Sequence, residues 1–202
     1  NFILTMMIEK GMSFDEALKI AQEKGYAEKD PTADVEGHDA CRKVCILASL
    51  AFGKHVYPNQ VETEGITNIS LEDVSYIENA GGVIKLLGQI KYINDNEIAA
   101  FVSPAVVYNG SQLASVKDVF NAILVRGDAV GDVCFYGPGA GKLPTASAVV
   151  ADIIDCAKHS ERKKIFGWGA GAEDYVVDYK EKIEMPFYVR AKATPAEINA
   201  KF

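Results

Sequence analysis

Residues 84–108 read IKLLGQIKYINDNEIAAFVSPAVVY, and this stretch decides the fold class. In its first half, apolar residues alternate with polar ones such as Lys85 and Lys91, which is the period of a strand with one face in solvent. An Asn-Asp-Asn turn follows, and residues 97–108 then read as a partner strand that Pro104 breaks or bulges. The stretch therefore predicts an antiparallel hairpin.

Helices are predicted before this hairpin, and more strands after it. Ser13 and Glu16 form a capping box that starts one helix, and Ser70 starts another. Residues 38–52 are apolar after a charged start, which predicts a helix buried all round. Two further strands and a last helix are predicted over 120–126, 132–136 and 145–158. We therefore predict an α+β fold, a mostly antiparallel or mixed sheet covered by helices on one face.

The composition is that of one globular domain. The chain has 202 residues, of which 49% are apolar and 24% charged, and its net charge is -7. This acidic balance argues against nucleic acids and anionic membrane surfaces as partners. The longest uncharged apolar run, Val44 to Gly53, is about half the ~20 residues that cross a bilayer. We therefore expect neither a nucleic-acid partner nor a membrane partner.

Cysteine and histidine usage points to an ordinary intracellular protein. Four cysteines are too few for a disulfide framework in a chain of this size, so we predict free thiols and a cytoplasmic location. The histidines, His38, His55 and His159, are scattered without metal-ligand spacing. We therefore expect no metal.

Residues 25–43 carry a dense group of carboxylates on a loop that leads into the predicted helix 38–52. Five lie within twelve residues: Glu28, Asp30, Asp34, Glu36 and Asp39. They could form a solvated acidic loop beside a helix N-terminus, a hard-metal site with oxygen ligands, or a pocket for a cationic substrate group. The regular ligand alternation of a calcium loop is absent. The residues alone leave these alternatives open.

Asp39 and Lys43 are four residues apart and therefore share one face of that helix. They could form an ordinary surface ion pair, worth about 0.3–0.5 kcal/mol. Lys43 is also the last charge before a long uncharged run, which predicts that its side chain is partly desolvated. A lysine desolvated beside a carboxylate can exchange a proton with a bound hydroxyl or carbonyl group.

Residues 137–145 read GPGAGKLPT and lie between a predicted strand and the last predicted helix. Bare backbone N–H groups and a helix N-terminus at such a place can face an anion or a flat cofactor ring. A tight structural turn would use the same residues. The spacing is neither that of a Walker loop nor that of a full dinucleotide fingerprint.

Taken together, these segments resemble the catalytic part of homoserine dehydrogenase. Asn1-Phe2-Ile3-Leu4 is similar to the end of that family's Gly-Thr-x-Asn-Phe/Tyr-Ile-Leu motif. Residues 25–43 resemble its signature almost residue for residue, and residues 135–149 resemble its late glycine-rich loop and the helix that follows. The resemblance implies an oxidoreductase of threonine and methionine biosynthesis that interconverts aspartate semialdehyde and homoserine with NADP or NAD.

The resemblance also implies roles for individual residues. Glu28 and Asp34 would lie in the amino-acid substrate site, Lys43 would handle the proton, and Asp39 would orient Lys43. The other carboxylates of the acidic segment are expected to be structural. The glycine-rich loop would approach the nicotinamide end of the cofactor, and the residues implied there are Gly137, Gly139, Ala140, Gly141 and Thr145.

The chain departs from the family's pattern at both ends. The 202 residues do not include the family's dinucleotide-binding domain, so we expect residues 1–186 to be a substrate-binding and dimerisation domain that is inactive alone. Residues 187–202 resemble the start of a regulatory ACT domain but do not continue its motif. The resemblance further implies a homodimer or a higher homo-oligomer. Two other hypotheses stay open, a non-catalytic dimerisation module and a metal-dependent hydrolase that uses the carboxylates.

Overall fold

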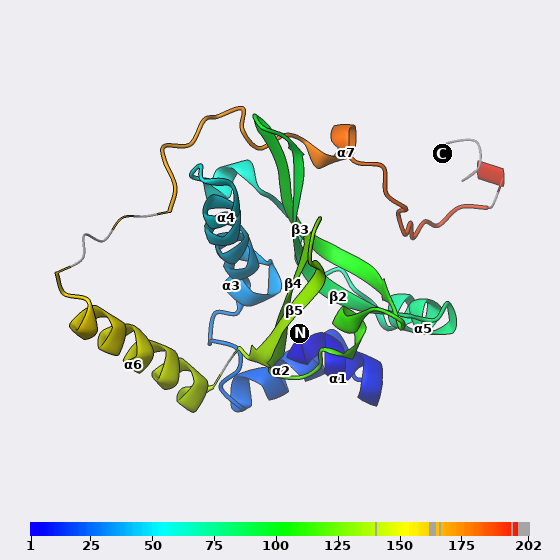
Figure 1. Cartoon of the computed structure of the whole chain (residues 1–202). Helices are drawn as coiled ribbons and strands as arrows, with labels where there is room; N and C mark the ends of the chain where they lie inside the picture. The colour runs from blue at the N-terminus through cyan, green and yellow to red at the C-terminus, as the bar shows by residue number, and fades with distance from the viewer. Residues whose placement is uncertain (140, 162–164, 166, 195, 198–202) are drawn as a thin grey trace.

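The predicted hairpin forms two strands of a three-stranded sheet. The computed structural model describes every residue except 140, 162–164, 166, 195 and 198–202. β2 (Gly82–Asn94) and β3 (Glu97–Tyr108) run antiparallel, and β1 (Glu62–Thr63) pairs in parallel with the other edge of β3. The strand order is therefore β1-β3-β2, which makes the sheet mixed (Figure 1).

Pro104 does not interrupt β3, so that prediction is wrong. It pairs with Leu86 within a continuous register, and the register shift of the hairpin lies between Tyr92 and Asn94 instead. β1 is only two residues long and its pairing ends before Pro104, so β3 is an edge strand at that point. An edge position tolerates a residue that has no N–H donor.

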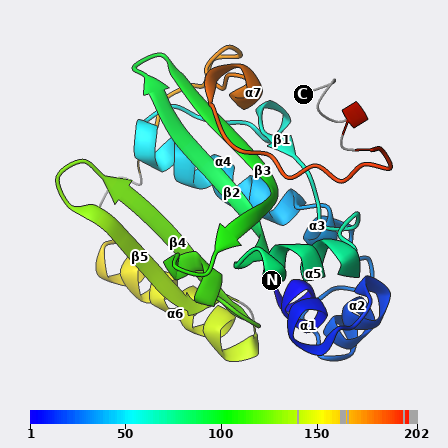
Figure 2. The ribbon, with the colours of Figure 1, turned by 90° about the vertical axis from the view of Figure 1, so that its right-hand side faces the viewer.

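α4 (His38–Phe52) lies across one face of β2 and β3 (Figure 2). A Cβ on Gly88 of β2 would fall 2.3 Å from Val44, so a glycine there allows the close approach of the helix. The sequence predicted a helix buried all round, and that prediction is wrong. Ile46 and Leu50 are 53% and 55% exposed. The sheet lies on one side of the helix only, so these two side chains on the outer face stay largely in solvent. The residues buried against the sheet are Cys41, Val44, Cys45, Ala48 and Ser49.

A second helical layer packs against β2. Its helices are α1 (Phe2–Lys10), α2 (Phe14–Glu23) and α5 (Leu71–Asn79), with the short α3 (Thr32–Val35) beside them. They enclose a core in which Leu4 and Met7 are fully buried. Both predicted capping serines, Ser13 and Ser70, start their helices with complete capping boxes. Two 3-10 turns, η1 (Pro58–Gln60) and η2 (Gln112–Ser115), complete the connections.

The C-terminal part of the chain packs on the opposite face of the sheet and on α5. Tyr179 of α7 (Tyr179–Lys182) stacks on Phe101 of β3, with the ring centroids 3.9 Å apart. Farther along, Tyr188 and Arg190 both donate hydrogen bonds to the buried carboxylate of Asp73 in the first turn of α5. This contact ties residues 188–190 to the helical layer.

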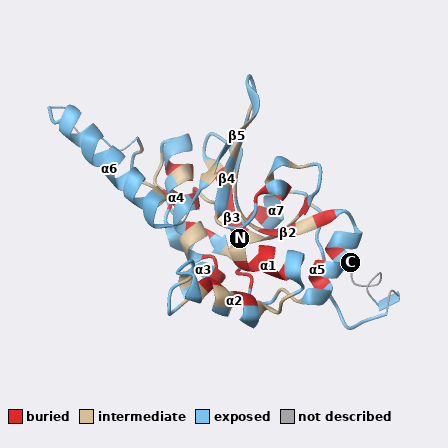
Figure 3. Cartoon of the chain, turned by 90° about the horizontal axis from the view of Figure 1, so that it is seen from below, coloured by how far each residue is buried: buried red, intermediate tan, exposed pale blue. Residues whose placement is uncertain are grey.

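The remaining elements form an arm, residues 120–158, that projects from this body (Figure 2). β4 (Phe120–Gly127) and β5 (Gly131–Pro138) pair antiparallel as a separate two-stranded sheet, as predicted. α6 (Lys142–Lys158) begins at Lys142 rather than at residue 145, and none of its residues, all of them described, is buried (Figure 3). Large apolar side chains of the arm are therefore in solvent, including Ile123, Val125, Phe135, Val149, Val150, Ile153 and Ile154. No helix in the described part of the chain is long and apolar enough to cross a membrane.

Candidate functional site

The acidic segment is folded around a short helix and a glycine turn. Asp30 accepts hydrogen bonds from the hydroxyl and the amide of Thr32, at 2.6 and 3.2 Å, and both bonds lower the pKa of Asp30. Gly37 follows α3 with a φ of 78°, and a Cβ there would meet the Thr63 side chain at 3.2 Å. Glycine at this position therefore allows the chain to turn from α3 into α4, against which α3 packs.

The candidate substrate residues lie on the outer side of this turn. Glu28 and Asp34 are exposed, and Asp39 is half-buried at the start of α4. Lys43 Nζ lies 2.7 Å from Asp39 Oδ2, as the four-residue spacing predicts. The Lys43 side chain is 61% exposed, so the prediction that it is partly desolvated is wrong for this chain. Lys43 projects from the face of α4 opposite the residues that are buried against the sheet.

Asn1, at the start of the first matching motif, lies beside Lys85 of β2. Its side-chain Oδ1 is 3.4 Å from Lys85 Nζ.

Lys85 is the site residue that sequence reasoning placed wrongly. Its position in the alternating pattern of residues 84–92 predicts a solvent-facing side chain, yet Lys85 is only 6% exposed. Its ammonium group donates hydrogen bonds to the Val116 carbonyl oxygen and to Asn1 Oδ1. The segment that follows η2 covers this part of β2, and strand periodicity carries no signal for such a long-range contact.

The glycine-rich loop lies at the base of the arm. Gly137 pairs with Asn121 across the hairpin, and the Gly139 amide donates a hydrogen bond of 3.0 Å to the carbonyl of Val119. A Cβ on Gly139 would fall 1.5 Å from Asn121 Nδ2, so only glycine fits at this position. Gly141 has a φ of 114° and precedes α6, whose N-terminus has no side-chain cap.

Thr145 and Ala140 are the other two candidate residues of this loop. Thr145 is exposed in the first turn of α6, and its amide donates to the Gly141 carbonyl at 3.2 Å. Ala140 lies outside the described residues. Between described residues, no hydrogen bond or ion pair joins the glycine-rich loop to the acidic segment. The acidic segment and the glycine-rich loop are called the two half-sites. The Asn1 side-chain amide donates to the Phe120 carbonyl at 3.0 Å, at the start of the arm.

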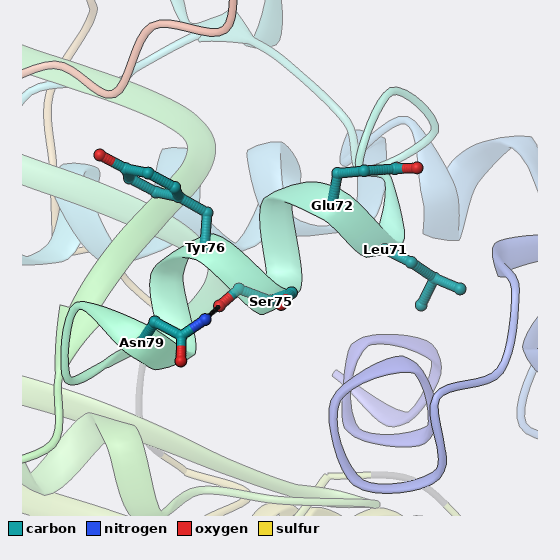
Figure 4. Close-up of a pocket in the computed structure, with 5 residues that line it drawn as sticks. All are labelled: Leu71, Glu72, Ser75, Tyr76 and Asn79. Atoms are coloured by element: carbon teal, nitrogen blue, oxygen red, sulfur yellow. Dashed lines mark hydrogen bonds between the residues drawn. The ribbon is translucent and has the colours of Figure 1, made fainter.

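Other features of the surface offer less chemistry. Within the ranges that the structure describes, no group of three or more His, Cys, Asp or Glu residues is arranged to hold a metal ion. The four cysteines are free, as predicted. An open pocket follows one face of α5 (Figure 4), and its lining residues are Leu71, Glu72, Ser75, Tyr76 and Asn79. None of these is a predicted site residue.

Known proteins of one family are similar to this chain in sequence and in fold. A family model described as homoserine dehydrogenase matches residues 1–154. The homoserine dehydrogenase of Bacillus subtilis (strain 168) is 45% identical over 159 residues, which are 79% of this chain and 36% of that protein. A solved homoserine dehydrogenase from Thiobacillus denitrificans has a TM-score of 0.75 at 43% identity, covering 88% of this chain and 42% of that one.

A more distant relative was solved with a cofactor. This hyperthermophilic archaeal homoserine dehydrogenase mutant, in complex with NADPH, has a TM-score of 0.59 at 30% identity and covers 78% of this chain and 44% of its own. The chain thus spans less than half the length of these relatives. The likeness confirms the predicted α+β class, and the matched residues include both half-sites. The chain belongs to the homoserine dehydrogenase family.

Proposed function

We propose that this chain supplies the amino-acid substrate site of an NAD(P)-dependent homoserine dehydrogenase, which interconverts L-aspartate 4-semialdehyde and L-homoserine. The observation that carries the proposal is the ion pair of Asp39 and Lys43, 2.7 Å apart at the start of α4 and inside the region that the family model matches. Asp34 lies in α3, which packs against α4, so the acidic segment and the Asp39–Lys43 pair are held together.

The exposed side chains suit the three polar groups of homoserine. Glu28 and Asp34 would accept hydrogen bonds from the substrate ammonium. Lys43, in its neutral form, would take the hydroxyl proton during oxidation and return it during reduction. Asp39, at 2.7 Å from Lys43 Nζ, would hold that group in its orientation. Because Lys43 is 61% exposed, bound substrate and surfaces outside this chain would have to exclude water from it.

The glycine-rich loop fits a nicotinamide cofactor, either NADP or NAD. Gly137 and Gly139 leave bare backbone there, and the first turn of α6 offers N–H groups without a side-chain cap. The cofactor supplies or accepts the hydride when it is bound. Gly137, Gly139, Gly141 and Thr145 would orient its nicotinamide end, and Ala140 belongs to the same proposed contact.

We also propose a homodimer that forms through the hairpin of the arm. Ile123, Val125 and Phe135 lie on one face of β4 and β5 and are 43%, 48% and 62% exposed. A two-stranded hairpin is marginally stable in water unless such a face is covered, and the same face of a second copy would cover it. A cytoplasmic location, supported by the free cysteines, is part of the proposal. We also propose that the substrate-binding domain ends at residue 186 and that a C-terminal extension begins at residue 187.

Lys43→Ala tests the proposed reaction in a full-length dehydrogenase that contains this chain. We expect turnover to fall by about 10²–10⁴-fold, because the group that carries the proton is removed. Steady-state oxidation of the reduced cofactor with aspartate semialdehyde measures the change. The fold should stay intact, since the Lys43 side chain projects into solvent. The 202-residue chain alone serves as the blank, for which we expect no turnover.

Lys19→Ala is the matched control, because Lys19 is an exposed helical lysine on α2, away from both half-sites. Its turnover should equal that of the unchanged enzyme. Near-normal activity of Lys43→Ala beside a normal control would remove Lys43 from its proposed role.

A further inference from the structure

Lys85 is a buried cation held by neutral groups. It is 6% exposed, and none of the ion pairs among the described residues includes it. Its Nζ lies 2.5 Å from the Val116 carbonyl oxygen and 3.4 Å from Asn1 Oδ1. Burial therefore lowers the pKa of Lys85. A buried ammonium group without a carboxylate partner is costly, and a shorter apolar residue would fill the same strand position.

The two groups that Lys85 contacts belong to one clamp on residues 116–120. The Asn1 side-chain amide lies within hydrogen-bond distance of the carbonyl oxygens of Val116, Asp118 and Phe120, at 3.3, 3.4 and 3.0 Å. By accepting from Lys85, Asn1 Oδ1 leaves the NH₂ group of the same side chain facing these carbonyls. Lys85 thus sets the orientation in which Asn1 can hold the segment.

The clamped segment has a backbone conformation that needs external support. Asp118 has a φ of 53°, and it is the one non-glycine residue with a positive φ in the described part of the chain. Its amide donates to the hydroxyl of Thr5 on α1 at 3.1 Å. Lys117 beside it pairs with Glu9 of the same helix at 2.6 Å. Three consecutive residues, 116–118, are therefore fastened to the body.

The same segment holds the glycine-rich loop. Directly after Asp118, the Val119 carbonyl accepts the hydrogen bond of the Gly139 amide at 3.0 Å. Asn121, two residues farther on, fills the space beside Gly139 so closely that a Cβ there would be 1.5 Å from it. The position of Gly139 relative to the body therefore depends on residues 116–121.

We propose that Lys85 is a positioning residue that couples the two half-sites, by holding Asn1 and Val116 so that residues 116–121 keep the glycine-rich loop in register with the acidic segment. β2 is the shared element, because α4 with the Asp39–Lys43 pair packs on this strand while Lys85 of the same strand holds Asn1, whose side chain holds the arm. The coupling to a reaction rests on the proposed function. The coupling of the loop to the body does not.

Amide hydrogen exchange of the 202-residue chain tests the coupling without any substrate. Lys85→Met keeps the length and apolar stem of the side chain and removes its donors. We expect the amides of Asp118 and Gly139 to exchange about tenfold faster or more, while the Ile98 amide in the sheet is unchanged. Lys85→Arg, which keeps donors at this position, should restore at least part of the protection.

Two further variants keep this test decisive. Lys91→Met changes an exposed lysine of the same strand and should alter none of the three amides. Asn1→Ala removes the other half of the clamp at an exposed position, so it reports even where Lys85→Met fails to fold, and it should loosen the same two amides. Equal acceleration at Ile98 would make Lys85 a general stabiliser and overturn the proposal. So would an unchanged rate at Gly139 in both clamp variants.

A kinetic measurement separates this proposal from the proposed function. In a full-length dehydrogenase that contains this chain, Lys85→Met should lower kcat by about tenfold or more and leave the KM for aspartate semialdehyde within about twofold. If Gly139 is loosened and kcat is unchanged, the loop is coupled to the body but does not orient the cofactor. That result would overturn the assignment of the loop and leave the coupling in place.

Discussion

The body and the arm of this molecule bury their apolar residues to opposite extents. In the body, Phe101 is 2% exposed and Leu4 is fully buried. In the arm, Phe135 is 62% exposed and no residue of α6 is buried. Both regions have regular elements with apolar faces. An apolar face on a helix or strand indicates that this face is buried against another surface. Whether that surface belongs to the same chain depends on the rest of the fold.

The contrast also explains why the two half-sites differ. The acidic segment is attached to α4, which packs on the sheet, and its turn at Gly37 is buried. The glycine-rich loop belongs to the arm and is tied to the body through residues 116–121. The relative position of the half-sites therefore depends on a few polar contacts rather than on a continuous core.

The largest effect is expected for Phe101→Ala, which removes the ring that packs on Tyr179. The free energy of unfolding should fall by about 4 kcal/mol, because a buried aromatic side chain leaves a cavity in the sheet. Urea denaturation of the 202-residue chain measures this change. Phe135→Ala in the arm is the matched control, and an equal loss in both variants would break the distinction between body and arm.

An intermediate effect is expected for Asp73→Ala, which removes the contact of residues 188–190 with α5. The free energy of unfolding should fall by about 2 kcal/mol, since the carboxylate closes the capping box and accepts from Tyr188 and Arg190. Thermal unfolding with Glu72→Ala as the exposed neighbouring control checks this. A loss no larger than that of the control would show that the body does not depend on its C-terminal segment.

The same carboxylate predicts a dependence of stability on pH. Burial raises the pKa of Asp73, but hydrogen bonds from Ser70 and Tyr188 and the charge of Arg190 outweigh it, and the net pKa lies below the ordinary value. Its contribution to stability is therefore complete above the ordinary pKa of an aspartate and is lost as the pH falls through the lower folded value. The stability difference between the parent and Asp73→Ala should shrink in acid.

The smallest effect on the stability of a single chain is expected for Phe135→Ser. At protein concentrations where the chain is monomeric, its free energy of unfolding should change by no more than about 0.5 kcal/mol, because the ring is mostly in solvent. In the proposed dimer the same change should raise the dissociation constant, which sedimentation measures. A large loss in the monomer would show that the arm is stabilised within its own chain.

Sequence reasoning was most accurate where the signal is local. The helix predicted over 38–52 has those bounds in the structure, and both capping boxes are present. The pairing of Asp39 with Lys43 followed from helical spacing alone. Each of these features depends on residues no more than about one or two helical turns apart, so the sequence contains all the partners that decide it.

Predictions were wrong where the partner lies far along the chain. Pro104 is accommodated because β1 leaves the edge of β3 free at that point. The outer face of α4, with Lys43, is exposed because the sheet covers one side of the helix only. Neither feature has a signal in the periodicity of its own element.

The sequence by itself determined the hairpin, the helix over 38–52, the two capping boxes, the Asp39–Lys43 pair and the membership of a family, because short-range spacing and motif residues carry that information. Tertiary structure alone decided that Lys85 is buried rather than exposed, and that Asn1 joins β2 to the arm. The physical reason is that burial and long-range hydrogen bonds depend on which segments meet in space. Lys85 and Val116 are separated by 31 residues, and the charge pattern around Lys85 resembles that of any exposed strand.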